Sequence, residues 1–190
     1  MLSCVCGLAL GIVAGFFRSL DAILMRIMDA MMSIPAILLA IALVAINRPT
    51  PTVLIVAIAL PEIPRVARLV RAVVLTIREQ TYVEAAVAVG TRPLRLLWRH
   101  VLPNAIAPLI VQATFVCALA IIIEASLSFL GAGTPPEVPS WGNIIAGGRS
   151  YLRNAPWILL YPGLLLGLTV LSVNLLGDGL RDMVDPRRRT

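Results

Sequence analysis

The side chains that could do chemistry in this chain of 190 residues are few and unevenly placed. Its one histidine, His100, lies in a basic stretch with Arg92, Arg95 and Arg99. The chain has no Ser-His-Asp set, G-x-S-x-G turn or H-E-x-x-H zinc motif, and a single histidine supports little hydrolytic chemistry. All sixteen basic residues are arginine, so there is no lysine for a phosphate-binding G-x-x-x-x-G-K-[ST] loop. We therefore expect no enzyme here, and we expect any ATP-driven work to be done by another chain.

The composition indicates that most of the chain lies in a lipid membrane. It is 59% hydrophobic and 14% charged, with a mean hydropathy of +0.92, which is outside the range of soluble domains. The net charge of +6 does not indicate nucleic acid binding, because the arginines cluster beside apolar runs, as they do on the cytoplasmic side of membranes. The cysteines have neither redox nor zinc spacing, and we interpret them as packing residues rather than metal ligands: Cys4, Cys6 and Cys117.

Five apolar segments predict an all-α, polytopic membrane protein with about five transmembrane helices, forming a single domain over residues 1–190. Three regions that hold thirteen arginines would face the cytoplasm, leaving only Arg48, Arg149 and Arg153 outside. This bias predicts a cytoplasmic C-terminus, a cytoplasmic loop at about 78–104 and an outer loop at about 131–156. The first segment is short for a span, so we expect residues to be missing upstream. The segments are Leu2–Phe17, Met28–Ile46, Thr52–Val74, Ala105–Leu130 and Trp157–Leu176.

Two acidic side chains lie inside apolar runs, where an ionisable group is costly enough to make function a natural hypothesis. Glu124 precedes Ser126 and Ser128, and Glu62 lies between two prolines. All four could line a pathway through the membrane. Alternatively, Glu124 is bonded to the serines and serves packing only, while Glu62 belongs to a kinked helix whose arginine face meets lipid phosphates. That face consists of Arg65, Arg68 and Arg71.

The cytoplasmic loop reads as two short helices with a sharp bend between them. Thr81 and Glu84 match a capping box, and Gly90 can adopt the left-handed conformation that ends a helix. Thr91 would cap the second helix, with a proline in its first turn, and Pro103 would close it. The predicted apolar faces are Tyr82, Ala85, Ala86 and Val89 in the first helix, and Leu94, Leu97, Trp98 and Val101 in the second, opposite the arginines. Because alanines let another surface approach closely, this loop is typical of a docking element.

The spacing in this loop resembles the EAA motif of permease subunits of bacterial ABC importers. E-A-A at 84–86 is followed by three residues, Gly90, nine residues, His100, one residue and Leu102-Pro103. The family has Ile where this chain has His100, and RHVLPN at 99–104 is similar to the dipeptide, oligopeptide and nickel branch. Further stretches resemble the second of the two permeases of such importers, whose N-terminal third has no counterpart here. They are SIPAILLAIALVA at 33–45, EASLSFLGAG at 124–133, PSWGNIIAGGRSYL at 139–152 and NLLGDGLRDMVDPR at 174–187.

This resemblance implies a type I ABC importer permease of the bacterial cytoplasmic membrane that moves dipeptides or oligopeptides. Its implied partners are a homologous second permease in a heterodimer, two cytoplasmic ABC ATPases that bind ATP and Mg²⁺, and an extracytoplasmic substrate-binding protein. The chain itself would hold no cofactor. Nickel or another small solute as cargo, a membrane enzyme or channel, and a non-functional fragment stay open as alternatives. The residues implied in ATPase coupling are Glu84, Ala85, Ala86, Gly90, Arg92, Arg95, Arg99, His100, Leu102 and Pro103.

Overall fold

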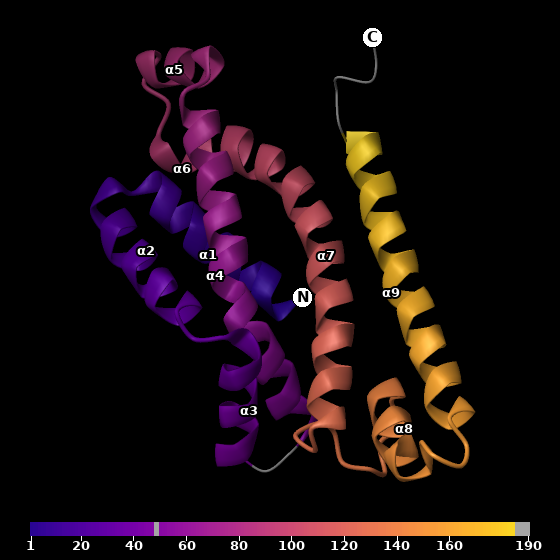
Figure 1. Cartoon of the computed structure of the whole chain (residues 1–190). Helices are drawn as coiled ribbons and strands as arrows, with labels where there is room; N and C mark the ends of the chain where they lie inside the picture. The colour runs from indigo at the N-terminus through magenta and orange to yellow at the C-terminus, as the bar shows by residue number, and fades with distance from the viewer. Residues whose placement is uncertain (48–49, 185–190) are drawn as a thin grey trace. The chain divides into compact units, whose positions relative to one another are not determined.

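The computed structural model describes residues 1–47 and 50–184, and every regular element within them is a helix (Figure 1). The all-α prediction is therefore confirmed. Arg48 and the tail arginines Arg187, Arg188 and Arg189, which entered the orientation argument, lie outside the described residues. The helices are α1 (Leu2–Phe16), α2 (Arg18–Met32), α3 (Ala36–Ile46), α4 (Pro51–Arg78), α5 (Thr81–Ala88), α6 (Pro93–Leu96), a π-helical turn (Leu97–Val101), α7 (Leu102–Phe129), α8 (Trp141–Gly148), a 3₁₀ turn (Arg149–Tyr151) and α9 (Trp157–Val184).

The backbone contacts divide the chain into two compact units, and α4, α7, α9 and, through its last residue, α2 are shared between them. Unit 1 consists of Met1–Met31, Ile63–Ala113 and the end of the chain from Gly177. Unit 2 consists of Met32–Glu62 and Thr114–Leu176. The loop at 78–104, which was predicted to be cytoplasmic, falls in unit 1. Glu124 and the predicted outer loop at 131–156 fall in unit 2.

The described helices do not reproduce the five predicted spans one for one. Two helical stretches are long and apolar enough to cross a membrane, Pro93–Phe129 and Trp157–Met183. The predicted span 28–46 is wrong as a single helix, because α2 ends at Met32 and α3 begins only after Pro35. Proline lacks an N–H group and disfavours the helical conformation in the residue before it. A third span would have to join α2 and α3 across this break.

The other two predicted spans correspond to helices that fall short in length or apolarity. The fifteen residues of α1 extend for only about 22 Å at 1.5 Å a residue, against about 30 Å of hydrocarbon. Residues 52–74 lie within the 28-residue helix α4, which is long enough but carries Glu62 and four arginines. Hydropathy averaged over a segment therefore located the apolar runs correctly, although it could not separate spanning from shorter helices.

In unit 1, α1 packs closely against α4 through a stripe of glycines. An added Cβ atom at Gly11 would lie 2.6 Å from the carbonyl oxygen of Ala67, and additions at Gly7 and Gly15 would meet valines at 2.5 and 2.7 Å. Glycines four residues apart fall on one helix face and let two backbones approach. This contact was not predicted, although the four-residue spacing of the glycines indicates it. The α4 partners also recur every four residues: Val66, Val70 and Val74.

Two arginines of the α4 face, Arg68 and Arg71, bind carboxylates of α2, a contact that the sequence did not predict. Arg71 donates from Nη2 to Oδ2 of Asp21 at 2.6 Å and also pairs through Nε, which makes the contact bidentate. Arg68 pairs with Asp29 at 2.6 Å. Because guanidinium and carboxylate groups match in geometry, the α2 carboxylates orient this face.

In unit 2, a small apolar core joins α3, the first part of α4 and the end of α7. Its buried members are Ala40, Val44, Leu54, Ala57 and Leu127. This core fixes the end of α7 from which the Glu124 side chain projects.

Candidate functional site

The loop at 81–103 bends at Gly90, as the sequence predicted. Gly90 has a φ of 81°, in the left-handed region that favours glycine. Its N–H group donates to the carbonyl of Val87 at 2.9 Å, and the N–H group of Thr91 donates to the carbonyl of Ala86 at 3.0 Å. These two bonds form a Schellman motif, in which a left-handed residue closes the last turn of a helix.

The predicted capping residues of the two short helices were wrong by one position. Gln80 precedes the first helical residue of α5, so Thr81 is inside the helix, and no capping bond from a side chain is formed. Arg92 likewise takes the position predicted for Thr91 in front of α6. Pro93 is the first residue of α6, as predicted, because a missing N–H group costs nothing there.

The second helix does not end at Pro103. A π-helical turn at Leu97–Val101 connects α6 directly to α7, and the N–H group of Leu102 donates to the carbonyl of Leu97 five residues back. The prediction that Pro103 closes a short helix is therefore wrong. A wider turn changes the hydrogen-bond register ahead of a proline, so that the helix continues through it. The loop thus leads from α5 through the bend at Gly90 into one continuous helix, Pro93–Phe129.

The same turn explains why only Leu97 and Val101 of the predicted apolar stripe of the second helix are half-buried or buried. Leu94 and Trp98 are 71% and 67% exposed, whereas Leu96 and Val101, which are five residues apart, are buried. A spacing of five is that of a π turn, whereas the prediction used the 3.6-residue period of an α-helix. In α5 the buried residue is Val83, which the predicted face did not include.

The residues implied in coupling lie mostly at the surface of this loop. Ala86, His100 and Leu102 are half-buried, and the His100 ring lies 5.7 Å from the ring of Tyr82, centroid to centroid. His100 therefore connects the π turn to α5, and the described residues contain no group of three His, Cys, Asp or Glu side chains that could hold a metal ion. The exposed members are Glu84, Ala85, Gly90, Arg92, Arg95, Arg99 and Pro103.

A hollow of about 540 Å³ lies beneath α5, where Glu84 and Arg78 are among the residues that line it. Arg78 donates to the carbonyls of Gly15 and Phe16 at 2.9 and 3.1 Å, and its guanidinium lies over the Phe16 ring. A cation at the last carbonyls of α1 satisfies groups that the helix leaves unpaired. Arg78 therefore ties α1 to the start of the loop.

A second candidate site surrounds Glu124 in unit 2. The Ser128 hydroxyl donates to Oε1 of Glu124 at 2.9 Å, a contact that the sequence offered as one of two alternatives. Ser126 instead donates to the carbonyl of Ile122 at 2.8 Å. Glu62 is buried, with 1% exposure, and does not line the hollow beside Glu124. The structure therefore brings together only two of the four predicted pathway residues.

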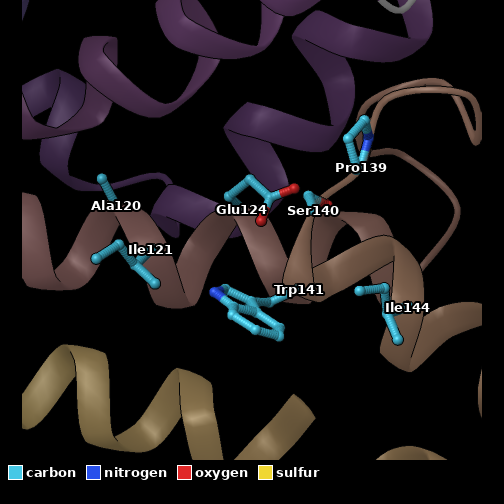
Figure 2. A pocket seen from close by; sticks show the side chains of 7 residues that line it. All are labelled: Ala120, Ile121, Glu124, Pro139, Ser140, Trp141 and Ile144. Atoms are coloured by element: carbon cyan, nitrogen blue, oxygen red, sulfur yellow. The ribbon is translucent and has the colours of Figure 1, made fainter.

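The half-buried Glu124 faces a hollow of about 580 Å³ between α7 and α8 (Figure 2). Figure 2 shows its carboxyl group beside Ser140, with the indole of Trp141 on the same wall as Ile121. Of the lining residues, all in the described part of the chain, Glu124 alone is charged. The remaining wall is apolar and consists of Ala120, Ile121, Pro139 and Ile144.

The outer wall of this hollow is held by an amide that the sequence analysis did not single out. Asn143 donates from Nδ2 to the Thr134 hydroxyl and to the carbonyls of Pro135 and Val138, at 3.0, 3.0 and 2.8 Å. The Ser140 hydroxyl accepts the N–H group of Asn143 at 3.0 Å and so caps α8. S-x-x-N at 140–143 was a readable cap signal, whereas the loop contacts depend on the fold.

Close packing joins α8 to α7 on the same wall. An added Cβ atom at Gly142 would lie 2.7 Å from Cα of Ala125, so only glycine fits. Gly131, with a φ of 82°, ends α7 in a second Schellman motif, in which its N–H group and that of Ala132 donate to the carbonyls of Ser128 and Leu127. The hollow is therefore preformed by backbone geometry.

Residues 7–190 match a protein family described as the inner membrane component of binding-protein-dependent transport systems. The chain is 58% identical over 93% of its length to a probable peptide ABC transporter permease of Sinorhizobium fredii. It is 43% identical over 97% to a dipeptide transport system permease of Alkalihalophilus pseudofirmus, and 42% identical over 97% to a glutathione transport system permease of Pectobacterium atrosepticum. It spans 60%, 61% and 62% of the lengths of these three relatives.

The fold resembles that in a solved structure of the MetNI methionine ABC transporter. The TM-score is 0.66 at 20% sequence identity, and the alignment covers 97% of this chain and 90% of the other. At this identity the likeness concerns the fold alone. It agrees with the type I importer permease fold that the sequence predicted.

Proposed function

Because the chain belongs to the family of inner membrane components of binding-protein-dependent transport systems, we propose that it is a permease subunit of an ATP-driven importer of dipeptides or oligopeptides. The observation that carries the proposal is the loop at 81–103. An exposed E-A-A helix is joined by a left-handed glycine to a helix long and apolar enough to cross a membrane. Such a bend suits a subunit whose helices are moved by another protein. A membrane location follows from the family and the apolar helices.

In this proposal, the exposed residues of α5 and the arginines of α6 contact a cytoplasmic ATPase. Two such ATPases bind ATP and Mg²⁺, and their closure moves α5. The backbone connects α5 through Gly90 to the start of the 93–129 helix, so a displacement of α5 moves that helix. The permease thereby switches between two discrete states. His100 and Tyr82 hold α5 against the π turn during that movement.

The remaining partners follow from the same assignment. A homologous second permease completes a heterodimer, an extracytoplasmic binding protein delivers the solute, and the C-terminus lies in the cytoplasm. Peptides are favoured as cargo because relatives at 42–58% identity are named as peptide, dipeptide and glutathione permeases. Glu124 lines the pathway, and Ser128 orients its carboxyl group, whereas Ser126 and Glu62 belong to the supporting structure.

The experiment compares two neighbouring glutamates. The chain is reconstituted with its second permease, ATPases and binding protein in proteoliposomes, and ATP-dependent uptake of a labelled dipeptide is measured. Glu84→Gln removes the charge of the docking helix, and Glu79→Gln is the control, because Glu79 is equally exposed but outside the motif. We expect uptake to fall only with Glu84→Gln. Equal uptake by the two variants would contradict the docking role, and no dipeptide uptake by the unmodified transporter would contradict the proposed cargo.

A further inference from the structure

The hollow beside Glu124 has the chemistry of a binding site for a small organic cation. It combines one carboxyl group, a hydroxyl group, an indole and an otherwise apolar wall. Its volume of about 580 Å³ lies within the range of about 300–1,000 Å³ typical of small-molecule sites. We propose that this hollow binds the primary ammonium group of a short, largely apolar ligand, and in the importer assigned above this ligand is the N-terminal end of a peptide.

The polar groups match an ammonium group better than a metal ion or an anion. The Ser128 hydroxyl binds Oε1 of Glu124 and thereby orients the carboxyl group, whose other oxygen is available as an acceptor. Ser140 accepts one backbone N–H group and, as a hydroxyl, has a second lone pair. A metal ion would need further ligands, and no arginine lines the hollow to receive a carboxylate.

The indole of Trp141 supplies the second attraction. An ammonium group over the face of a tryptophan ring is held by the ring quadrupole, more strongly where water is excluded. The apolar residues beside it exclude water on one side and accommodate the body of the ligand. Because α8 is fixed by Gly142 and Asn143, the carboxyl group and the indole are positioned before the ligand arrives.

A primary ammonium group could reach the hollow from a peptide or from an ethanolamine lipid headgroup. The test uses the full chain in phosphatidylglycerol nanodiscs, with Trp98 and Trp157 changed to phenylalanine so that Trp141 alone reports by fluorescence. The probes are alanyl-alanine and its N-acetylated form. The titration with alanyl-alanine is then repeated in nanodiscs that contain phosphatidylethanolamine.

We expect alanyl-alanine to change the fluorescence saturably and the acetylated form not to do so. Glu124→Gln should weaken binding about tenfold or more, as expected for the loss of a charge-assisted hydrogen bond. Glu137→Gln should leave binding unchanged, because Glu137 lies exposed in the same loop and does not line the hollow. Ala120→Phe fills the hollow while keeping the carboxyl group, and should abolish binding even if Glu124→Gln does not fold.

Equal binding of both probes, or equal affinity in Glu124→Gln and the unmodified chain, would overturn the proposal. Weaker apparent affinity for the peptide in phosphatidylethanolamine nanodiscs supports an ammonium site that lipid can also occupy. An unchanged affinity supports the peptide as the ligand. Because binding is measured without ATP or partner subunits, a failure here would leave the Glu84 result intact, and a failure of dipeptide uptake would leave the ammonium site intact.

Discussion

Replacement of Gly90 tests whether the bend between α5 and α6 takes part in coupling, and it introduces no steric clash. A Cβ atom added at Gly90 meets nothing within 4 Å, so Gly90→Ala is opposed only by the positive φ of 81°. The left-handed conformation costs a residue with a side chain about 1–2 kcal/mol. This corresponds to a 5–30-fold change in the ratio of the bent to the unbent loop.

The matched control is Gly131→Ala. Gly131 has a φ of 82°, also with open space around it, and ends α7 in the same type of motif outside the docking loop. The two variants should lower the melting temperature by similar amounts, because the backbone strain is the same. Gly131→Ala serves only as the control for stability, because Gly131 ends α7 beside the Glu124 hollow. In the reconstituted transporter, Gly90→Ala should reduce dipeptide uptake per ATP hydrolysed, and Gly90→Asn should be milder, because asparagine tolerates this conformation.

Two outcomes would refute this reasoning. If Gly90→Ala lowered the melting temperature but left uptake per ATP unchanged, the bend would not take part in coupling. If Gly90→Asn were as harmful as Gly90→Ala, the positive φ would not be the cause of the loss.

Two further expectations concern the supporting structure. Gly11→Ala places a methyl group 2.6 Å from the Ala67 carbonyl oxygen and should destabilise the protein by about 1–3 kcal/mol in thermal unfolding. The control Gly167→Ala in α9 meets no atom within 4 Å and should not destabilise it. Equal melting temperatures of the two variants would contradict the close packing of α1 on α4. Asn143→Ala removes an amide whose two hydrogens are shared among three acceptors, at about 1 kcal/mol for each hydrogen, so the loop amides at 132–140 should exchange hydrogen faster. The control Asn154→Ala, at an exposed position, should leave that exchange unchanged, and slow exchange in Asn143→Ala would show that other contacts hold the loop.

The sequence predicted best those features that depend on a few neighbouring residues. The left-handed turn at Gly90 follows from the residue type and was confirmed. The Glu124–Ser128 contact joins positions one helical turn apart and was one of the alternatives that the sequence offered. The 3.6-residue period predicted for the second loop helix was wrong at the π turn, because Pro103 was interpreted as the end of a short helix and not as a residue that a wider turn precedes. The three bonds of Asn143 were beyond prediction, since they require the path of the loop around it.

The spacing of the E-A-A motif can be explained from the geometry of the bend. In the Schellman motif, Ala86 supplies the carbonyl that accepts the bond from Thr91, so the left-handed residue must follow Ala86 by four positions, where Gly90 stands. The distant Leu-Pro pair has a different reason. The π turn lies immediately before Pro103 and lets one helix continue through it, so that a loop segment and a membrane-length helix become one body. Glu84, by contrast, has no such geometric role, is exposed, and forms no capping bond. Glycine and proline in the motif therefore shape the backbone, and contact of the exposed Glu84 side chain with another protein stays a prediction that Glu84→Gln tests.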